Sequence, residues 1–265
     1  MAFKVLVCAK QVPDTNEIKI NPETGTLIRD GVPSILNPDD ANALEEALKI
    51  KDKFDDVHVT VITMGPPQAE EMLFECIAMG ADEGILISDR AVGGSDTWAT
   101  SNAITAAIKK YGDFDMIFAG RQAIDGDTAQ VGPQIAEHLD LPLISYAQDI
   151  KVEGDSVIVQ RQYDDRYHVL KAKMPCVITA LSELNEPRYM TPGGIFDAYD
   201  AEITTWGRKD LKDVDDSNLG LAGSPTQIAK ASDKVRKGKG VMMTAETAEE
   251  GVEYIMDKLL TKHVI

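Results

Sequence analysis

The sequence predicts an α/β fold in which a mainly parallel β-sheet is covered by helices on both faces. Three observations lead to this prediction. Apolar runs of strand length alternate with helical patterns four times over about the first 140 residues. The expected strands are almost continuously apolar, which is typical of strands buried on both faces of a sheet. A chain of 265 residues with 43% hydrophobic residues is large enough to bury such a sheet.

Four segments have the length and composition of buried strands. They cover residues 3–9, 57–65, 84–88 and 115–120. In parallel sheets, ligands bind outside the carboxyl ends of the strands, where helix N-termini can offer free N–H groups to a phosphate. We therefore expect a ligand-binding rim built from the loops that follow these strands. These loops are residues 8–15, 63–67, 88–97 and 119–128.

Helical patterns fill the intervals between the strands. They cover residues 37–54, 66–81, 96–112 and 129–139. Asn37 or one of the next aspartates can cap the first helix. Its apolar stripe consists of Ala43, Leu44, Ala47, Leu48 and Ile50. The second helix opens with prolines, which a first turn tolerates, and closes at Gly80. The third has an Asp or Ser cap.

The rest of the chain is less regular. Residues 18–32 have the pattern of a hairpin around Thr24 and Gly25, and residues 149–181 that of a hairpin followed by a strand. A long irregular segment with a basic run at 230–239 then leads to an amphipathic helix at 247–263. So long a structureless stretch is uncommon within a compact domain, so we expect it to wrap around another subunit. The alternative is a floppy surface tail.

Composition limits the classes of partner. The chain carries 44 acidic against 27 basic residues, a net charge of −17, which argues against nucleic-acid binding. No apolar run approaches 18 residues, so no membrane span is expected, and the N-terminus lacks the layout of a signal peptide. Cys8, Cys76 and Cys176 are isolated in apolar surroundings, which favours core positions and a reducing cytoplasm.

The stretch AGRQAIDGDTAQVGPQIAEHLDLP, residues 119–142, is the strongest candidate for a ligand site. It joins an expected strand to an expected helix and combines three glycines with polar side chains. Gly120 lets the backbone approach a ligand. A turn at 125–128 with Thr128 as helix cap leaves N–H groups facing outward. The structural alternative is an Asp-Gly turn, a Thr cap and Gly-Pro in a first helical turn, and spacing alone does not separate the two interpretations.

Standard catalytic and phosphate motifs do not occur in the sequence. No GxGxxG follows the first strand and there is no Walker A sequence. The run GGSDT at 93–97 weakly resembles the pyrophosphate loop of ATP-splitting synthetases, but it stands late in the domain. The histidines at 58, 138, 168 and 263 lack the spacing of metal ligands. We therefore expect neither a metal site nor a catalytic acid or base.

Four motifs favour the ligand interpretation of 119–142. They are GRQAIDGDTAQVGP at 120–133, NPDDANALEEALKIKD at 37–52, TMGPPQAEE at 63–71 and LNEPRY at 184–189. In this order and spacing they resemble the beta subunit of electron transfer flavoprotein. The similarity runs from VLVCAKQVPDT at 5–15 to about residue 205, and more weakly to the end.

The resemblance implies an adenine-nucleotide-binding, alpha-hydrolase-like α/β domain at residues 1–205. An arm, residues 206–265, would wrap an alpha subunit that carries FAD. In the respiratory branch of the family the beta site holds a structural AMP, whereas in the bifurcating branch it holds a second FAD with NADH beside it. The small residues Gly126, Thr128 and Gly132 favour the bifurcating branch. The alternatives are a respiratory-type subunit with AMP and a nucleotide-binding regulator of similar fold.

By resemblance, the cofactor lies on the expected rim. Its expected contacts are Cys8, Ala9, Asn37, Asp40, Met64, Gly65, Asp96, Thr97, Gly120, Arg121, Gln122, Ala123, Asp125, Gly126, Asp127, Thr128, Gln130, Val131 and Gly132. Backbone N–H groups of 125–132 would hold the phosphates. The chemistry implied is hydride transfer from NADH to a flavin, which needs no catalytic acid or base from the protein.

The same resemblance implies several partners in anaerobic metabolism. Besides the alpha subunit, these are a flavin-dependent acyl-CoA or hydroxy-acid dehydrogenase, and ferredoxin or flavodoxin. The family's recognition loop for dehydrogenases follows NEPRY. Here it reads MTPGGIFDAYDAEI, residues 190–203, with Pro192 at the apolar anchor position and Asp197 and Asp200 in place of a basic run. This departure puts docking on a standard acyl-CoA dehydrogenase in doubt.

Two apolar residues of this loop are candidate docking anchors. Ile195 and Phe196 follow two glycines, so we expect them to be exposed on a flexible loop. The alternative is that both side chains pack into the chain's own core.

Overall fold

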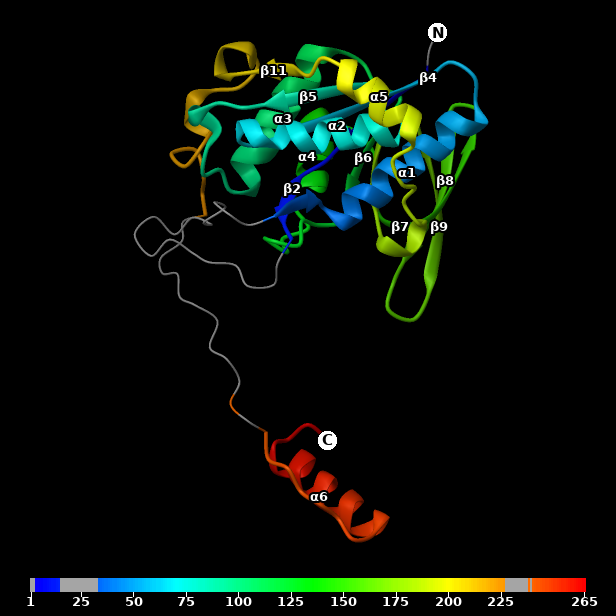
Figure 1. Ribbon diagram of the computed structural model, residues 1–265, viewed down its shortest axis with the longest axis vertical. Helices are drawn as coiled ribbons and strands as arrows, with labels where there is room; N and C mark the ends of the chain where they lie inside the picture. Colours follow the sequence, from blue (N-terminus) through cyan, green and yellow to red (C-terminus); the bar gives the residue numbers. More distant parts are fainter. Residues whose placement is uncertain (1–2, 15–32, 227–237, 239) are drawn as a thin grey trace. The chain divides into compact units, whose positions relative to one another are not determined.

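The structure is a computed structural model that describes residues 3–14, 33–226, 238 and 240–265. It confirms an α/β fold built on a large, mostly parallel sheet with helices on both faces (Figure 1). The hairpin expected at 18–32 and most of the basic run at 230–239 lie outside the described residues.

One nine-stranded sheet forms the centre, in the order β11-β5-β4-β1-β6-β10-β7-β8-β9. Its strands are β1 (Phe3–Cys8), β4 (Val57–Met64), β5 (Glu83–Ile87), β6 (Met116–Gly120), β7 (Leu143–Glu153), β8 (Ser156–Gln162), β9 (Tyr167–Lys173), β10 (Cys176–Ala180) and β11 (Thr204–Trp206). The pairs from β11 to β7 are parallel, and those of β7, β8 and β9 are antiparallel. The strands expected from the sequence at the four buried segments are thus confirmed as β1, β4, β5 and β6. Two short strands, β2 (Gln11–Pro13) and β3 (Ser34–Leu36), form a separate antiparallel pair.

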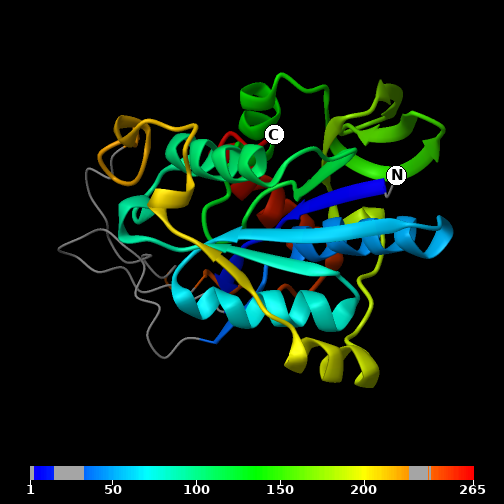
Figure 2. The same ribbon diagram turned by 90° about the horizontal axis from the view of Figure 1, so that it is seen from above.

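Helices pack on both faces of the sheet, and each strand sends alternate side chains to the two sides. The α-helices are α1 (Pro38–Lys53), α2 (Glu70–Met79), α3 (Thr97–Tyr111), α4 (Val131–Leu139), α5 (Pro192–Asp200) and α6 (Ala248–Thr261). Val5 and Val7 of β1 join a core cluster with α1 and α2, while Leu6 and Cys8 join a second cluster with α3 and α4. Figure 2 shows the sheet between these helices. Short 3-10 helices lie at Pro67–Ala69, Arg90–Val92, Ser182–Leu184, Arg208–Asp210 and Asp216–Asn218.

The helix boundaries follow the local chemistry of the sequence. Asp96 caps α3, because its side chain accepts a hydrogen bond from the Ala99 N–H. Gly80 ends α2 with a φ of 130°, which other residues rarely adopt. The expected cap at Thr128 is wrong: α4 begins at Val131 with Gln130 at the N-cap position, and no side chain caps it.

The segment after β10 differs most from expectation. The prediction of a flexible loop at 190–203 is wrong, because residues 192–200 form helix α5. Pro192 stands in the first turn, where it is tolerated, and the Thr191 hydroxyl accepts a hydrogen bond from the Gly194 N–H at 2.9 Å. A Cβ on Gly194 would lie 2.2 Å from the Ala78 carbonyl oxygen, so glycine there allows α5 to approach α2.

The chain divides into two compact units, Met1–Lys230 and Ala231–Ile265. The first unit includes β11, which pairs with β5, and Leu211 and Leu219, which are buried in its core. The boundary near residue 205 and the arm at 206–265 that wraps another subunit stay predictions. In the second unit, α6 is amphipathic and none of its residues is buried. Of the helices in the described parts of the chain, none is both long and apolar enough to cross a membrane.

Candidate cofactor site

The loops that follow β1, β4 and β6 meet at the carboxyl edge of the sheet, because these three strands are neighbours and run parallel. The N-terminus of α1 joins them. The Asn37 N–H donates to the Lys10 carbonyl at 2.9 Å, which ties the start of α1 to the loop after β1. We call this edge the rim and define it by residues 8–14, 37–40, 63–66 and 119–132.

Asp40 links two of the rim loops. One of its carboxylate oxygens accepts a hydrogen bond from the Lys10 N–H, and the other accepts one from the Gly120 N–H, both at 2.9 Å. Burial raises the pKa of Asp40 to about 7, although these hydrogen bonds act in the opposite direction. A Cβ on Gly120 would lie 2.4 Å from the Asp40 carboxylate. Gly120 is therefore required by packing within the chain.

Asn37 holds the middle of the loop after β6. It is fully buried, its side-chain oxygen accepts from the Ile124 N–H at 3.0 Å, and its amide donates to the Gln122 carbonyl at 2.9 Å. The polar groups of Asn37 and Asp40 are thus used to position loops. Direct contact of either side chain with a cofactor stays a prediction.

Side-chain contacts also fix the outer part of the loop at 120–132. Lys10 Nζ lies 2.6 Å from an Asp125 carboxylate oxygen, and the Gln122 amide donates to Asp127 at 2.8 Å. The Gln130 side chain accepts a hydrogen bond from the Thr97 hydroxyl at 2.9 Å, which connects the loop to α3. The predicted site residues from the loops after β1, β5 and β6 are therefore brought together.

The backbone of this loop leaves donors free. Asp127 and Ala129 adopt positive φ values of 49° and 53°, which are uncommon for residues other than glycine. No residue in the described part of the chain accepts a hydrogen bond from the N–H groups of residues 128–132. A run of free N–H groups at a helix N-terminus is suited to binding a phosphate. Gly126 has no atom within 4 Å of where its Cβ would lie, so the loop is open on this side.

A small cavity of about 40 Å³ opens between the loops after β1 and β4. Its lining residues are Lys10, Gln11, Thr63, Met64, Gly65, Pro66 and Ala69. The Thr63 hydroxyl oxygen and the Gln11 side-chain oxygen are buried there without a partner among the described residues. Buried polar groups are rarely left unpaired in folded proteins, so a ligand group that supplies the missing hydrogen bonds fits this place. The cavity admits one such group rather than a whole nucleotide.

Four more of the predicted site residues, Cys8, Ala9, Asp96 and Gly132, are held by packing or hydrogen bonds within the chain. Cys8 and Ala9 are buried at the end of β1, and burial raises the pKa of the Cys8 thiol to about 12. Asp96 caps α3 and accepts a second hydrogen bond, from the Thr226 N–H at 2.8 Å. Gly132 packs against the Thr179 methyl group, which would lie 2.8 Å from an added Cβ.

Arg121 pairs with a neighbour on α1. Its Nε lies 3.2 Å from an Asp39 carboxylate oxygen, and burial raises the pKa of Asp39 despite this charge. The expected rim loops contain Lys10, Gln11 and Thr63, but none of the three was among the expected cofactor contacts. The signal that could have found Lys10 and Gln11 is their place directly after a buried strand. Among the residues that the structure describes, no group of three His, Cys, Asp or Glu side chains could hold a metal ion.

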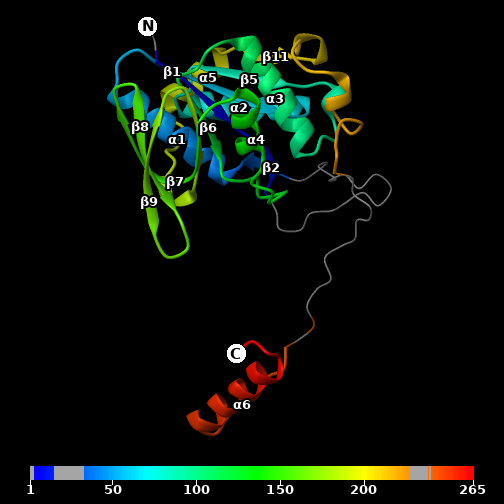
Figure 3. The same cartoon turned by 180° about the vertical axis from the view of Figure 1, so that it is seen from behind.

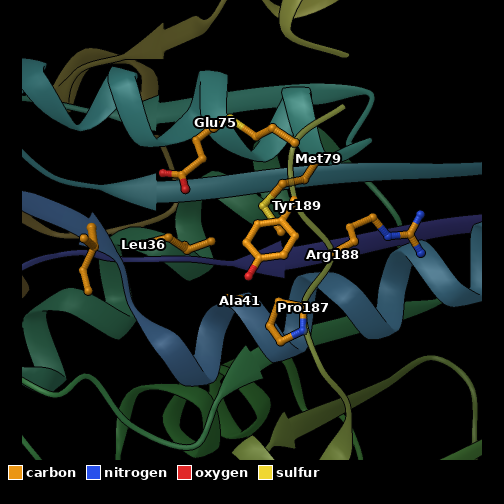
Figure 4. A pocket seen from close by; sticks show the side chains of 9 residues that line it. Leu36, Ala41, Glu75, Met79, Pro187, Arg188 and Tyr189 are labelled. Atoms are coloured by element: carbon orange, nitrogen blue, oxygen red, sulfur yellow. The ribbon is translucent and has the colours of Figure 1, made fainter. Parts of the chain in front are cut away.

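A second surface lies on the α1 and α2 side of the sheet. A cleft of about 200 Å³ separates α1 from α2, and the segment that leads to α5 crosses it (Figure 4). Arg188 on this segment forms a bidentate pair with Glu45 at 2.8 and 3.0 Å and contacts Asp52 at 2.7 Å. The Asn42 side chain donates to the Asn185 carbonyl at 2.6 Å.

The helix that follows this segment exposes large apolar side chains. Phe196 is 76% exposed and Tyr199 88% exposed, and Ile195 is also exposed. The alternative that Ile195 and Phe196 pack into the chain's own core is therefore wrong. The expectation that they are exposed is confirmed, although on a helix.

Comparison with known proteins agrees with the motifs. Residues 24–217 match the family described as "Electron transfer flavoprotein domain". The chain is 56% identical over 263 residues to the "Caffeyl-CoA reductase-Etf complex subunit CarD" of Acetobacterium woodii, which covers 99% of this chain and 100% of that protein. With the same coverage it is 54% identical over 263 residues to the "Electron transfer flavoprotein subunit beta" of Clostridium acetobutylicum. It is 51% identical over 270 residues to the "Acryloyl-CoA reductase electron transfer subunit gamma" of Anaerotignum propionicum, again covering 99% and 100%.

Proposed function

This chain belongs to the electron transfer flavoprotein family, and on that premise we propose that it is the beta subunit of an electron-bifurcating member. A FAD bound at the rim would supply the redox chemistry, which is hydride transfer from NADH followed by release of electrons along two routes. One route leads through the alpha-subunit flavin to a partner dehydrogenase, and the other to ferredoxin or flavodoxin.

The observation that carries this proposal is the free backbone of the loop after β6. The N–H groups of residues 128–132 have no acceptor in the described part of the chain, and they precede α4. In the proposal they bind the phosphates of the cofactor, assisted by the positive end of the helix dipole. The ion pair of Lys10 with Asp125 holds the outer part of this loop against the loop after β1.

Other rim residues are suited to bind the cofactor or to hold the loops in position. The unpaired oxygens of Thr63 and Gln11 are suited to accept hydrogen bonds from a base or ribose. Asn37 and Asp40 keep the loops after β1 and β6 at a fixed separation. Because the protein's part is binding and orientation, a site with no catalytic acid or base is sufficient for this reaction.

One observation supports a flavin dinucleotide over AMP, and another supports the class of partner. The space beside Gly126 is open, which leaves room for more than a mononucleotide. In addition, the names of two relatives connect them with caffeyl-CoA reductase and acryloyl-CoA reductase. These names support an acyl-CoA reductase or dehydrogenase, rather than a hydroxy-acid dehydrogenase, as the partner.

Two surfaces are proposed for protein partners. The exposed apolar face of α6, with Val252, Ile255 and Leu260, is suited to lie on the alpha subunit. The aromatic side chains of α5 are suited to dock the partner dehydrogenase. We propose a cytoplasmic location because all three cysteines are buried, free thiols.

Flavin and nucleotide content of the purified heterodimer tests this function. Two FAD per heterodimer are expected, measured by absorbance and by chromatography of the released cofactors. One FAD with one AMP would instead support a respiratory-type subunit. A chain that purifies alone and without flavin would support a nucleotide-binding regulator.

A further inference from the structure

The cleft between α1 and α2 opens directly beside the exposed side of α5. Met190 lines the cleft, and the next residue, Thr191, is the N-cap of α5 and donates its N–H to the Ala78 carbonyl of α2 at 3.4 Å. Tyr189 also lines the cleft, and its side chain is 93% exposed (Figure 4). The cleft and the helix therefore form one continuous surface. We call it the α5 surface and define it by Glu75, Tyr189, Met190, residues 195–197 and residues 199–200.

The exposed side of α5 has an apolar flank and an acidic flank. Ala198 is buried against Ile77 and Ala78 of α2. Successive residues of a helix are rotated by about 100°, so the residues around Ala198 fall on two exposed flanks. The apolar flank consists of Ile195, Phe196 and Tyr199. The acidic flank consists of Asp197 and Asp200, which are also exposed.

The carboxylates of the α5 surface have no basic partner within the chain. Among the residues that the structure describes, none forms a hydrogen bond or ion pair with the side chain of Glu75, Asp197 or Asp200. Asp200 stands in the last turn of α5, which contains no basic residue, so the helix dipole acts against its charge. These charges therefore do not stabilise the chain itself, and a positively charged partner would complement them.

Glu75 is the acidic group of the cleft. Its side chain extends from α2 towards α1 (Figure 4), and burial raises the pKa of its carboxyl. The guanidinium of Arg188, which also lines the cleft, already pairs with two carboxylates of α1. The apolar walls of the cleft include Leu36, Met79 and Pro187. A lysine or arginine side chain suits such a cleft, because its carbon stem can pack on the apolar walls while its charge reaches the carboxylate.

We propose that the α5 surface binds a flavin dehydrogenase whose docking site is an apolar pocket edged by lysine and arginine residues, one of which enters the cleft beside Glu75. This inference rests on the proposed function, in which α5 docks that partner. The apolar flank contributes most of the affinity, and the three carboxylates accelerate the encounter and select the partner. A dehydrogenase with an acidic docking site is repelled.

The test compares the double variant Asp197→Asn/Asp200→Asn, the variant Glu75→Gln and the control Asp113→Asn. Asp113 is exposed and follows α3, which covers the other face of the sheet (Figure 3). Each heterodimer is reduced with NADH under anaerobic conditions and mixed with the reductase component of the Acetobacterium woodii caffeyl-CoA reductase-Etf complex. Stopped-flow absorbance gives the second-order rate constant of electron delivery at low salt and at about 1 M NaCl, where the Debye length is about 3 Å.

The double variant should lower this rate constant by about fivefold at low salt and match the wild type at about 1 M NaCl. Glu75→Gln should raise the dissociation constant of the complex with the reductase by about tenfold, measured by analytical ultracentrifugation. Asp113→Asn should change neither quantity. Reduction of the bound flavin by NADH and the melting temperature should not fall in any variant, because each substitution removes a carboxylate without a partner.

Several results would overturn the inference. Equal rate constants at low salt for the double variant and the control would show that the acidic flank does not face the partner, and a faster double variant would mean that the partner's docking site is acidic. An unchanged dissociation constant for Glu75→Gln would show that no basic side chain enters the cleft. A lower melting temperature of that variant would assign Glu75 a structural role. A wild-type heterodimer whose flavin NADH does not reduce would contradict the proposed function, which separates the two failures.

Discussion

The loop at 120–132 and the segment at 185–200 both follow central strands, and the same helix positions both of them. The first part of α1 holds the loop: Asn37 and Asp40 bond to the backbone of Ile124, Gln122 and Gly120. The later part of α1 holds the segment, where Asn42 bonds to Asn185, and Glu45 and Asp52 pair with Arg188. One helix with a polar, largely buried face thus determines the geometry of both candidate surfaces.

The two regions differ in the groups that they expose to a binding partner. The loop presents backbone N–H groups and a glycine with free space beside it, which suits a small anionic ligand. The segment presents aromatic rings on a short helix, which suits a protein surface. A change in the contacts of one region should therefore affect cofactor binding or partner docking, but not both. The predictions below test this separation in order of decreasing effect on stability.

Gly120→Ala should have the largest effect. The added Cβ would lie 2.4 Å from the Asp40 carboxylate and 2.7 Å from backbone atoms of Asp39 and Asp40, so the loop or α1 must move. We expect a loss of roughly 3 kcal/mol or more in the free energy of unfolding. Urea denaturation followed by circular dichroism measures this loss.

Gly126→Gln on the same loop is the matched control. Nothing lies within 4 Å of its added Cβ, so stability should not change. Its long side chain should instead reduce flavin occupancy of the rim. Equal destabilisation by the two substitutions would contradict the distinction between a packed and an open side of the loop.

Asp40 should make stability depend on pH. Its pKa is raised from 3.8 to about 7 in the folded chain, so between these values the folded chain holds a proton that the unfolded chain has released. The stability that the protonated Asp40 contributes to the folded chain is fully present below pH 3.8 and is lost as the pH rises through about 7. The loss is on the order of a few kcal/mol. Asp40→Asn cannot ionise and should remove this slope, which urea denaturation between pH 5 and pH 8 would reveal. Parallel curves for the two proteins would mean that burial does not raise the pKa of Asp40.

Glu45→Gln should act on the other region. It removes one charge from the bidentate pair with Arg188, whose pKa is raised mainly by the hydrogen bond to Glu45. Because Glu45 is buried, we expect about 1–3 kcal/mol of destabilisation, a slower reduction of the partner dehydrogenase and unchanged flavin content. The more exposed Asp52→Asn should have a smaller effect. Loss of flavin from the Glu45 variant would break the separation of the two regions.

Phe196→Ala should have little effect on stability, because the side chain is 76% exposed. If α5 docks the dehydrogenase, the substitution should slow electron delivery to that partner and leave reduction of the bound flavin by NADH unchanged. Stopped-flow absorbance with and without the dehydrogenase separates the two steps. Phe54→Ala, a partly exposed phenylalanine at the end of α1, is the control. Failure of both steps would assign Phe196 a structural role.

Much of the fold could be predicted from the sequence because its signals are local. The apolar runs that became β1, β4, β5 and β6, and the cap at Asp96 and the stop at Gly80, need no knowledge of distant residues. Helix α5 was missed because two glycines in its first turns are poor helix formers. The contact of Gly194 with Ala78 explains the second of these glycines and depends on tertiary structure. The pairing of β11 with β5 is likewise a long-range contact.

The location of the candidate site could be predicted from the sequence, but the roles of its individual residues could not. The glycines and polar residues of 120–132 indicated a ligand, and the strand order predicted where the loops meet. The sequence could not show that Asn37 and Asp40 are engaged by the backbone of two loops, because those contacts join residues up to 87 positions apart. Nor could it show that Thr63 is left unpaired beside the cavity.

The central claim is that the rim binds a flavin that NADH can reduce. The most direct measurement is an anaerobic titration of the purified heterodimer with NADH, followed by flavin absorbance, in the absence of any dehydrogenase. We predict bleaching of the flavin bound at the rim, and loss of that bleaching in Gly126→Gln while the alpha-subunit flavin is retained. A wild-type heterodimer whose flavin NADH does not bleach, and which releases AMP on denaturation, would contradict the account.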